Sequence, residues 1–200
     1  MPSPSASALV IGGGVVGLAC ALALQARGVR TALLDDGRAG MAPSWGNAGH
    51  IAVEQVEPLA SLATLRSAPR RLHAFGGPLD VRQPLRQLPW LARYARACLP
   101  ARFAAGRDAL RGLLADALPA WRRLAKAIDA PDLLRERGHW LCWESPASAA
   151  RGRKAWAAAD VGSAAMSDLP AAEAAQLQSA LAVTLGGAIA FAGTAQVADL

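Results

Sequence analysis

Three glycines with the spacing GxGxxG, set between an apolar run and a helical pattern, restrict the fold of this chain more than any other feature. Residues 8–11 are an apolar run typical of a buried parallel strand, and Gly12, Gly14 and Gly17 follow it directly. Gly12 permits a tight turn out of the strand, Gly14 leaves space for a ligand beside the backbone, and Gly17 lets the next helix pack closely on the sheet. The pattern predicts a strand, a glycine turn and a helix in that order.

A helix and a second strand are expected next along the chain. Residues 15–27 have the apolar spacing of a helix, and Gly28 stands where a helix C-terminus favours glycine. Residues 31–34 are a second apolar run, and Asp35 ends it, about 20 residues beyond the glycines. A carboxylate there can accept hydrogen bonds from both ribose hydroxyls of a dinucleotide, and it disfavours a 2′-phosphate. Asp36 is a second candidate for this acid, although the end of the strand favours Asp35.

Together these features predict a dinucleotide-binding βαβ unit, for which FAD or NAD is a better ligand than NADP. The first N–H groups of the helix, and the positive end of its dipole, are expected to face the pyrophosphate. The predicted contacts with the dinucleotide come from Gly12, Gly14, Val15, Val16, Gly17 and Asp35.

A second segment bears on the choice between a flavin and a nicotinamide cofactor. It comprises residues 43–51 and has the sequence PSWGNAGHI. It resembles the S-x-x-N-A-G stretch of FAD-dependent amino-acid oxidoreductases, in the group of D-amino-acid dehydrogenases and glycine oxidases. In that stretch serine and asparagine supply neutral hydrogen-bond donors, and small residues admit a flat ligand. The resemblance implies cofactor contacts at Ser44, Asn47, Ala48, Gly49 and His50, with His50 near the flavin ring.

The resemblance also implies an enzyme that oxidises a D-amino acid at its Cα–N bond, by hydride transfer to FAD. The expected partner is a small-molecule amino-acid substrate, and the flavin would carry the redox chemistry. This reaction does not clearly require any acid or base among the 200 residues of the chain, so no catalytic residue is assigned. Two alternatives stay open: an NAD-dependent oxidoreductase with the same glycine pattern, and a truncated fragment that at most binds nucleotide.

The expected fold class is α/β, with a Rossmann-like FAD-binding βαβ unit joined to part of a mixed α+β substrate domain. The resemblance covers the whole chain, although it is loose between residues 52 and 185. It predicts strands over 138–143 and 186–191, and a helical stretch over 107–129 that Pro119 kinks or breaks. The expected parts are a disordered tail over 1–7, an FAD-binding part over 8–60, a substrate-domain part over 61–192 and a return to the FAD domain over 193–200.

Relatives continue for about as many residues again beyond the point that matches Leu200. Two parallel strands by themselves are too few for a stable sheet, so the remaining strands would come from that later half. The resemblance therefore implies a fragment, for which three explanations stay open: a truncated gene, a split reading frame, or a first half that needs a missing C-terminal half as a second polypeptide.

Arginine is concentrated in one region of a chain whose net charge is +6. Between Arg66 and Arg111 there are ten arginines and two acids, and leucines interleave with the arginines. Such a stretch suits either an anionic membrane surface or an ordinary solvated basic face. The family resemblance implies a respiratory-chain electron acceptor, with which a membrane surface would agree. Charge alone would admit nucleic acid, but no nucleic-acid motif accompanies it, so no nucleic-acid partner is expected.

The cysteines and the N-terminal residues bear on the compartment. Cys20, Cys98 and Cys142 are odd in number and far apart, which favours a reducing compartment and argues against a disulfide framework or a metal site. Residues 1–7 carry no lysine or arginine, unlike the start of a signal peptide. The expected location is the cytoplasm, with peripheral attachment to the inner face of the cell membrane as an alternative.

Overall fold

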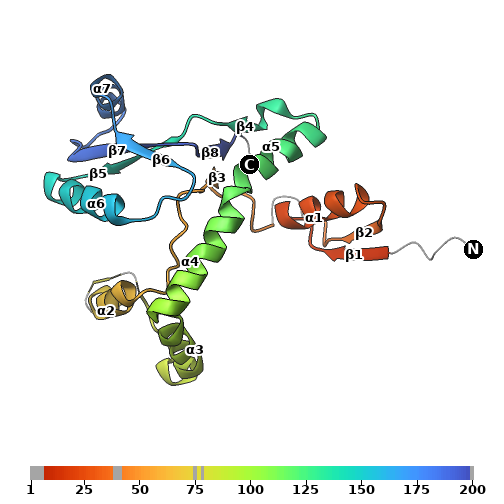
Figure 1. Cartoon of the computed structure of the whole chain (residues 1–200), viewed down its shortest axis with the longest axis horizontal. Coiled ribbons are helices and arrows are strands. Elements are labelled where there is room, and N and C mark those ends of the chain that lie inside the picture. The colour runs from red at the N-terminus through yellow and green to blue at the C-terminus, as the bar shows by residue number, and fades with distance from the viewer. Residues whose placement is uncertain (1–6, 38–41, 74–75, 78, 199–200) are drawn as a thin grey trace, which may run out of the picture. The chain divides into compact units, whose positions relative to one another are not determined.

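The computed structural model describes residues 7–37, 42–73, 76–77 and 79–198. Its helices and small sheets give a mixed α/β fold (Figure 1). The chain divides into two compact units. Unit 1 contains residues 1–50, 121–135 and 196–200, and unit 2 contains residues 51–120 and 136–195.

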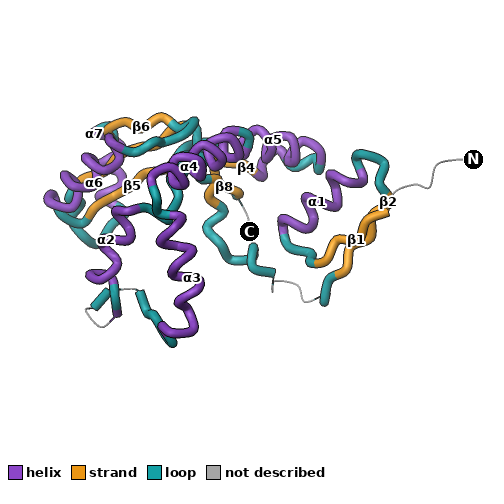
Figure 2. The backbone as a smooth tube through the Cα atoms, turned by 60° about the horizontal axis from the view of Figure 1, so that its bottom comes forward, coloured by secondary structure: helices purple, strands orange, loops and turns teal. Residues whose placement is uncertain are grey.

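Unit 1 begins with a strand–helix–strand element in which the strands are parallel. β1 (Ser7–Ile11) pairs with β2 (Arg30–Leu34), and α1 (Val15–Gln25) connects them. α1 packs against both strands (Figure 2), and it ends where Gly28 adopts a φ of +76°. The two strands and the helix predicted from the apolar runs are confirmed, with α1 ending two residues before the predicted boundary.

The apolar side chains of this element lie mostly at its surface. Among the described residues of β1, α1 and β2, none is buried. Leu9, Ile11 and Leu34 are exposed by 61%, 76% and 56%. A parallel sheet normally has both faces covered, because its strands are apolar on both sides. α1 covers one face of the β1–β2 pair, and the other face, which carries Leu9 and Ile11, has no covering layer within the described residues of unit 1.

A second sheet has the strand order β3-β8-β4 and joins segments that are far apart in the sequence. Its strands are β3 (His50–Ile51), β4 (Leu134–Arg135) and β8 (Ala195–Val197). β4 pairs with β8 in antiparallel fashion, with Leu134 opposite Val197. A short 3₁₀ helix, η2 (Pro131–Leu133), leads into β4.

Unit 2 contains an antiparallel sheet of order β5-β7-β6. Its strands are β5 (His139–Trp143), β6 (Ala165–Asp168) and β7 (Gly187–Ala192). α6 (Pro146–Ala158) packs against β5 and β7, and α7 (Ala171–Ser179) follows β6. The predicted strands over 138–143 and 186–191 are confirmed as β5 and β7, each starting one residue later.

The core of this sheet is centred on the middle strand. Ile189 and Phe191 of β7 are each 2% exposed. Trp156 of α6 meets the Phe191 ring edge-on at 4.9 Å, and the His139 ring of β5 stacks on it at 4.8 Å. Burial of large apolar side chains from a helix and two strands gives this sheet the packing that β1 and β2 lack.

Four further helices lie between residues 62 and 127. They are α2 (Leu62–Arg71), α3 (Pro84–Ala97), α4 (Pro100–Ala115) and α5 (Ala117–Ala127). The helical stretch expected over 107–129 is broken, but at Asp116 and not at Pro119. Pro119 lies in the first turn of α5, where its missing N–H costs no intrahelical hydrogen bond. Among the described helices, none has the length and apolar character needed to cross a membrane.

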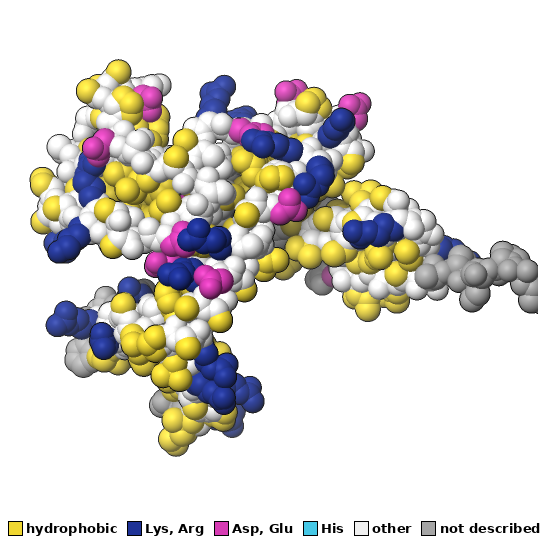
Figure 3. All heavy atoms as spheres, in the orientation of Figure 1, with side chains coloured by type: hydrophobic (Ala, Val, Ile, Leu, Met, Phe, Trp, Pro, Cys, Tyr) yellow, Lys and Arg dark blue, Asp and Glu magenta, His cyan; other side chains and the backbone are white. Residues whose placement is uncertain are grey.

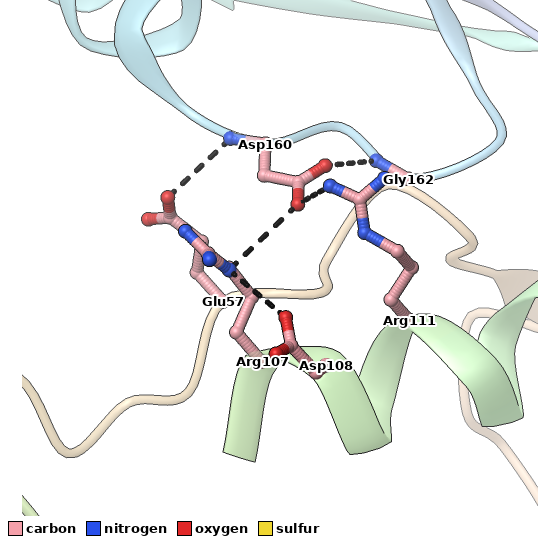
Figure 4. Close-up of polar contacts among 6 residues, drawn as sticks. All are labelled: Glu57, Arg107, Asp108, Arg111, Asp160 and Gly162. Atoms are coloured by element: carbon pink, nitrogen blue, oxygen red, sulfur yellow. Dashed lines mark hydrogen bonds and ion pairs between the residues drawn. The ribbon is translucent and has the colours of Figure 1, made fainter. Parts of the chain in front are cut away.

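A polar cluster links α4 to the loop after α6 within unit 2 (Figure 4). The Asp160 carboxylate accepts the Gly162 N–H at 3.0 Å and pairs with Arg111, and the Asp160 N–H donates to Glu57 at 3.3 Å. Arg107 Nε lies 4.0 Å from the same carboxylate. The Gly162 hydrogen bond, and then the two arginines, lower the pKa of Asp160 against an opposing effect of burial.

The disordered tail expected over 1–7 falls on residues 1–6, which lie outside the described residues, and on Ser7, which belongs to β1. The domain boundaries expected at residues 60 and 192 stay predictions.

Candidate functional site

The glycine turn leads directly from β1 into the first turn of α1. The Gly12 N–H donates to the Leu34 carbonyl at 2.8 Å, and Gly12 has a φ of +102°, which favours glycine. A Cβ at Gly17 would lie 1.9 Å from the Gly12 carbonyl oxygen, and real atoms cannot approach so closely. Glycine is therefore required at position 17, because α1 passes directly over the glycine turn. The Val10 side chain would lie 3.5 Å from the same Cβ.

Asp35 is bonded to the glycine turn. Its Oδ2 accepts the Gly13 N–H at 2.6 Å, and its Oδ1 accepts the Gly37 N–H at 2.9 Å. A Cβ at Gly13 would lie 2.9 Å from Oδ2, so a side chain there would displace the carboxylate. The predicted acid and the predicted glycines thus lie together at the carboxyl ends of β1 and β2.

Ser44 lies at the N-terminus of α1. Its Oγ accepts the Val15 N–H at 3.2 Å, and a Cβ at Gly14 would lie 3.4 Å from the same oxygen. A hydroxyl that accepts one hydrogen bond keeps its own O–H for donation. Val16, also in the first turn, is 74% exposed. The residues brought together at this end of α1 are Gly12, Gly14, Val15, Gly17, Asp35 and Ser44.

Residues 47–49, the second half of the S-x-x-N-A-G stretch, are held by a different set of hydrogen bonds. Asn47 Oδ1 accepts the Gly49 N–H at 2.6 Å, which closes a tight turn. The Ala48 carbonyl accepts the Gln196 side-chain amide at 2.8 Å, and the Gly49 carbonyl accepts the Val197 N–H at 2.8 Å. His50 is exposed and begins β3. The hydrogen bonds of residues 47–49 thus run within their own turn and to β8.

Two kinds of residue were missed by the sequence reasoning. Gly13 supplies the N–H that Asp35 accepts, and the run of three consecutive glycines was the signal for it. Gln196 and Val197 hold the loop that contains Ala48 and Gly49. Nothing local marks these two residues, since their partners are almost the whole chain away.

The cluster at the start of α1 fits the pyrophosphate of a dinucleotide. Gly14, the N-cap, makes no side-chain capping bond, and the first turn of α1 has no acidic residue. The positive end of the helix dipole therefore favours an anion at this end of α1, where the Gly13 N–H already donates to the Asp35 carboxylate. Asp35 accepts the N–H groups of Gly13 and Gly37, and a carboxylate is also the kind of group that accepts a hydrogen bond from a ribose hydroxyl.

Comparison with protein families supports this fit. The sequence matches the family described as FAD dependent oxidoreductase (DAO) over residues 7–200, nearly the whole chain. Comparisons with curated proteins and with solved structures gave no match. Because members of the matched family bind FAD, the predicted cofactor is confirmed, and the NAD alternative gains no support. The chain therefore belongs to the family of FAD dependent oxidoreductases.

Proposed function

We propose that this protein is a D-amino-acid dehydrogenase or oxidase, in which the described residues form a Rossmann-like FAD-binding part and part of a substrate domain. The cluster of the glycine turn, Asp35 and Ser44 carries the proposal, because it brings two motifs from different segments to one helix terminus. The resemblance of residues 43–51 to D-amino-acid oxidoreductases supports the finer choice of substrate.

Each part of the cluster has a physical role in this proposal. The N–H groups at the start of α1 bind the pyrophosphate, Asp35 binds the ribose of the adenosine, and Ser44 donates to the cofactor. Residues 47–50 lie beside the flavin, where Ala48 and Gly49 allow a close approach. His50 is a neighbour of the flavin in this proposal and is not assigned a catalytic role.

Bound FAD would supply the two-electron redox chemistry by which the Cα–N bond of the amino acid is oxidised to an imine, which water would hydrolyse to a 2-oxo acid and ammonium. The protein must hold the Cα–H bond close to the acceptor and must exclude other reactions from the site. The electron acceptor of the reduced enzyme, proposed here as a respiratory-chain component, and the cytoplasmic location both stay predictions from the sequence.

A C-terminal half is proposed as the partner that completes the FAD-binding part. The exposed apolar side chains of β1 and β2 support this proposal, because further parallel strands would bury them. Supplying that half as a second polypeptide should raise the affinity for FAD and lower the exposure of these strands.

The first test is the absorbance spectrum of the purified chain with FAD, followed by gel filtration. Flavin bands that stay with the protein, and that D-amino acids bleach under anaerobic conditions, are the expected result. Asp35→Ala should weaken FAD binding by about tenfold or more, because a hydrogen bond to a charged group contributes about 1.5–3 kcal/mol. Asp36→Ala, which removes the same charge from the next residue, is the matched control.

The outcomes test the proposed substrate and the proposed role of Asp35 separately from the family assignment. Bound flavin that L-amino acids bleach and D-amino acids do not would contradict the substrate while the family assignment stands. Equal losses from Asp35→Ala and Asp36→Ala would contradict the role given to Asp35.

A further inference from the structure

One helix of unit 2 combines exposed apolar side chains with positive charge. Between Asp80 and Asp108 the chain has six arginines and no acidic residue, and α3 lies within this stretch. Arg86, Arg93 and Arg96 of α3 are all exposed. Figure 3 shows basic and apolar side chains gathered over α3.

The inner side of α3 is fixed by packing. Cys98, which caps the helix, is 1% exposed, and Leu91 and Tyr94 are half-buried. The Tyr94 hydroxyl donates to the Leu59 carbonyl at 2.9 Å, and its ring stacks on Trp90 at 5.3 Å. These contacts determine which side of the helix faces outward.

The outward side carries exposed apolar side chains in the first half of the helix and arginines in both halves. Leu85 and Leu88 lie one helical turn apart and are 80% and 55% exposed, and Trp90 on the flank is 59% exposed. Arg86, Arg93 and Arg96 lie alongside them at helical spacing. We call these six residues the α3 surface: Leu85, Arg86, Leu88, Trp90, Arg93 and Arg96.

We propose that the α3 surface binds a lipid bilayer with anionic headgroups, with the helix lying in the plane of the interface. Leucine and tryptophan side chains enter the boundary between headgroups and acyl chains, and arginines bind the phosphates beside them. A nucleic acid would neutralise the arginines but would leave Leu85 and Leu88 in water. An anionic bilayer would both bury the apolar side chains and neutralise the arginines of the α3 surface. This proposal does not depend on the identity of the oxidised substrate.

The test is flotation of the full chain with lipid vesicles. The chain should float with vesicles of phosphatidylcholine containing about 30% phosphatidylglycerol, and much less with phosphatidylcholine alone, because each arginine near an anionic surface contributes about 1 kcal/mol. The double variant Arg93→Gln, Arg96→Gln should then weaken vesicle binding about 30-fold, because it loses two contributions of about 1 kcal/mol each. Arg137→Gln with Arg151→Gln, two exposed arginines elsewhere in unit 2, is the matched control.

A second pair of variants tests the apolar half without changing charge. Leu85→Gln with Leu88→Gln should weaken vesicle binding about tenfold or more, since two buried leucines are replaced by polar groups. Leu113→Gln on α4, where the leucine is 73% exposed, should leave binding unchanged. All these side chains are exposed, so thermal unfolding should confirm that each variant folds like the parent.

Three outcomes would overturn the proposal. One is equal binding to neutral and anionic vesicles, or binding to neither. Another is binding to RNA without binding to vesicles. A third is a dimer in gel filtration that Leu85→Gln with Leu88→Gln dissociates while vesicle binding is unchanged.

Discussion

Gly17 is the single residue on which the geometry of the candidate site depends most directly. Its Cα lies so close to the Gly12 carbonyl that a methyl group would overlap the oxygen. Gly17→Ala should therefore displace α1 from the glycine turn, costing about 2 kcal/mol or more in the free energy of unfolding and abolishing FAD binding. Urea unfolding and flavin absorbance measure the two effects.

The control for Gly17 is another helical glycine. A Cβ at Gly112 of α4 meets nothing within 4 Å. Gly112→Ala should leave FAD binding unchanged and stabilise the chain by about 0.5–1 kcal/mol, because alanine loses less entropy than glycine in a helix. Similar FAD binding by the Gly17 and Gly112 variants would contradict the proposed role of Gly17.

Asp160 makes the stability of unit 2 depend on pH. Because its pKa is lowered in the folded protein, first by the Gly162 N–H, the carboxylate contributes stability above its unfolded pKa. That contribution is lost as pH falls below about 4 and through the lowered value. In Asp160→Asn the contribution is absent at every pH, so we expect a lower urea midpoint at pH 7 and a smaller further loss between pH 5 and pH 3.

The control for Asp160 comes from α4. Asp108 also lies near Arg107, at 3.7 Å, but its side chain is 70% exposed. Asp108→Asn should change the urea midpoint at pH 7 little, because exposed ion pairs contribute little. If it matched the effect of Asp160→Asn, the assigned role of the cluster would be wrong.

At the scale of elements, α6 begins with a reciprocal cap. Ser145 Oγ accepts the Ser148 N–H at 3.2 Å, Ser148 Oγ accepts the Ser145 N–H at 3.2 Å, and Pro146 occupies the first helical position. Ser145→Ala should destabilise unit 2 by about 1 kcal/mol, since the Ser148 N–H at the helix start loses the side-chain oxygen that accepts it. Ser163→Ala, at an exposed loop serine, should have little effect in the same thermal unfolding experiment.

At the scale of the whole molecule, the two units should differ in local stability. β7 carries buried Ala188, Ile189 and Phe191, whereas β1 and β2 have no buried side chain among their described residues. Backbone amides of β1 and β2 should therefore exchange with solvent on the order of 100-fold faster than those of β7 when FAD is absent. Hydrogen exchange followed by mass spectrometry measures this difference.

FAD provides the internal control for that measurement. Added FAD should slow exchange over residues 9–17 and 30–35, because ligand binding stabilises the element that holds it. Exchange in β7 should change little. Uniform slowing over the whole chain would contradict a site confined to the β1–α1–β2 element.

The elements whose cause is local could be predicted from the amino-acid sequence. Alternation of an apolar run, glycines at fixed offsets and a helical pattern was enough to predict β1, α1 and β2. The same reasoning placed Asp35 at the end of its strand, and the structure bonds it to the glycine turn. β5 and β7 were also predicted, although from the family resemblance of residues 138–143 and 186–191 and not from a local pattern alone.

The pairing of segments that are distant in the sequence could not be predicted and became visible in the folded chain. β6 lies in an alanine-rich stretch without a strand pattern and becomes a strand because β7 offers it a partner. The break at Asp116, the contact of Ala48 and Gly49 with β8, and the bond of Ser44 to Val15 were likewise not predictable. Local patterns constrain neighbours in sequence, whereas these contacts depend on backbone groups that find partners only when the folded chain brings them together.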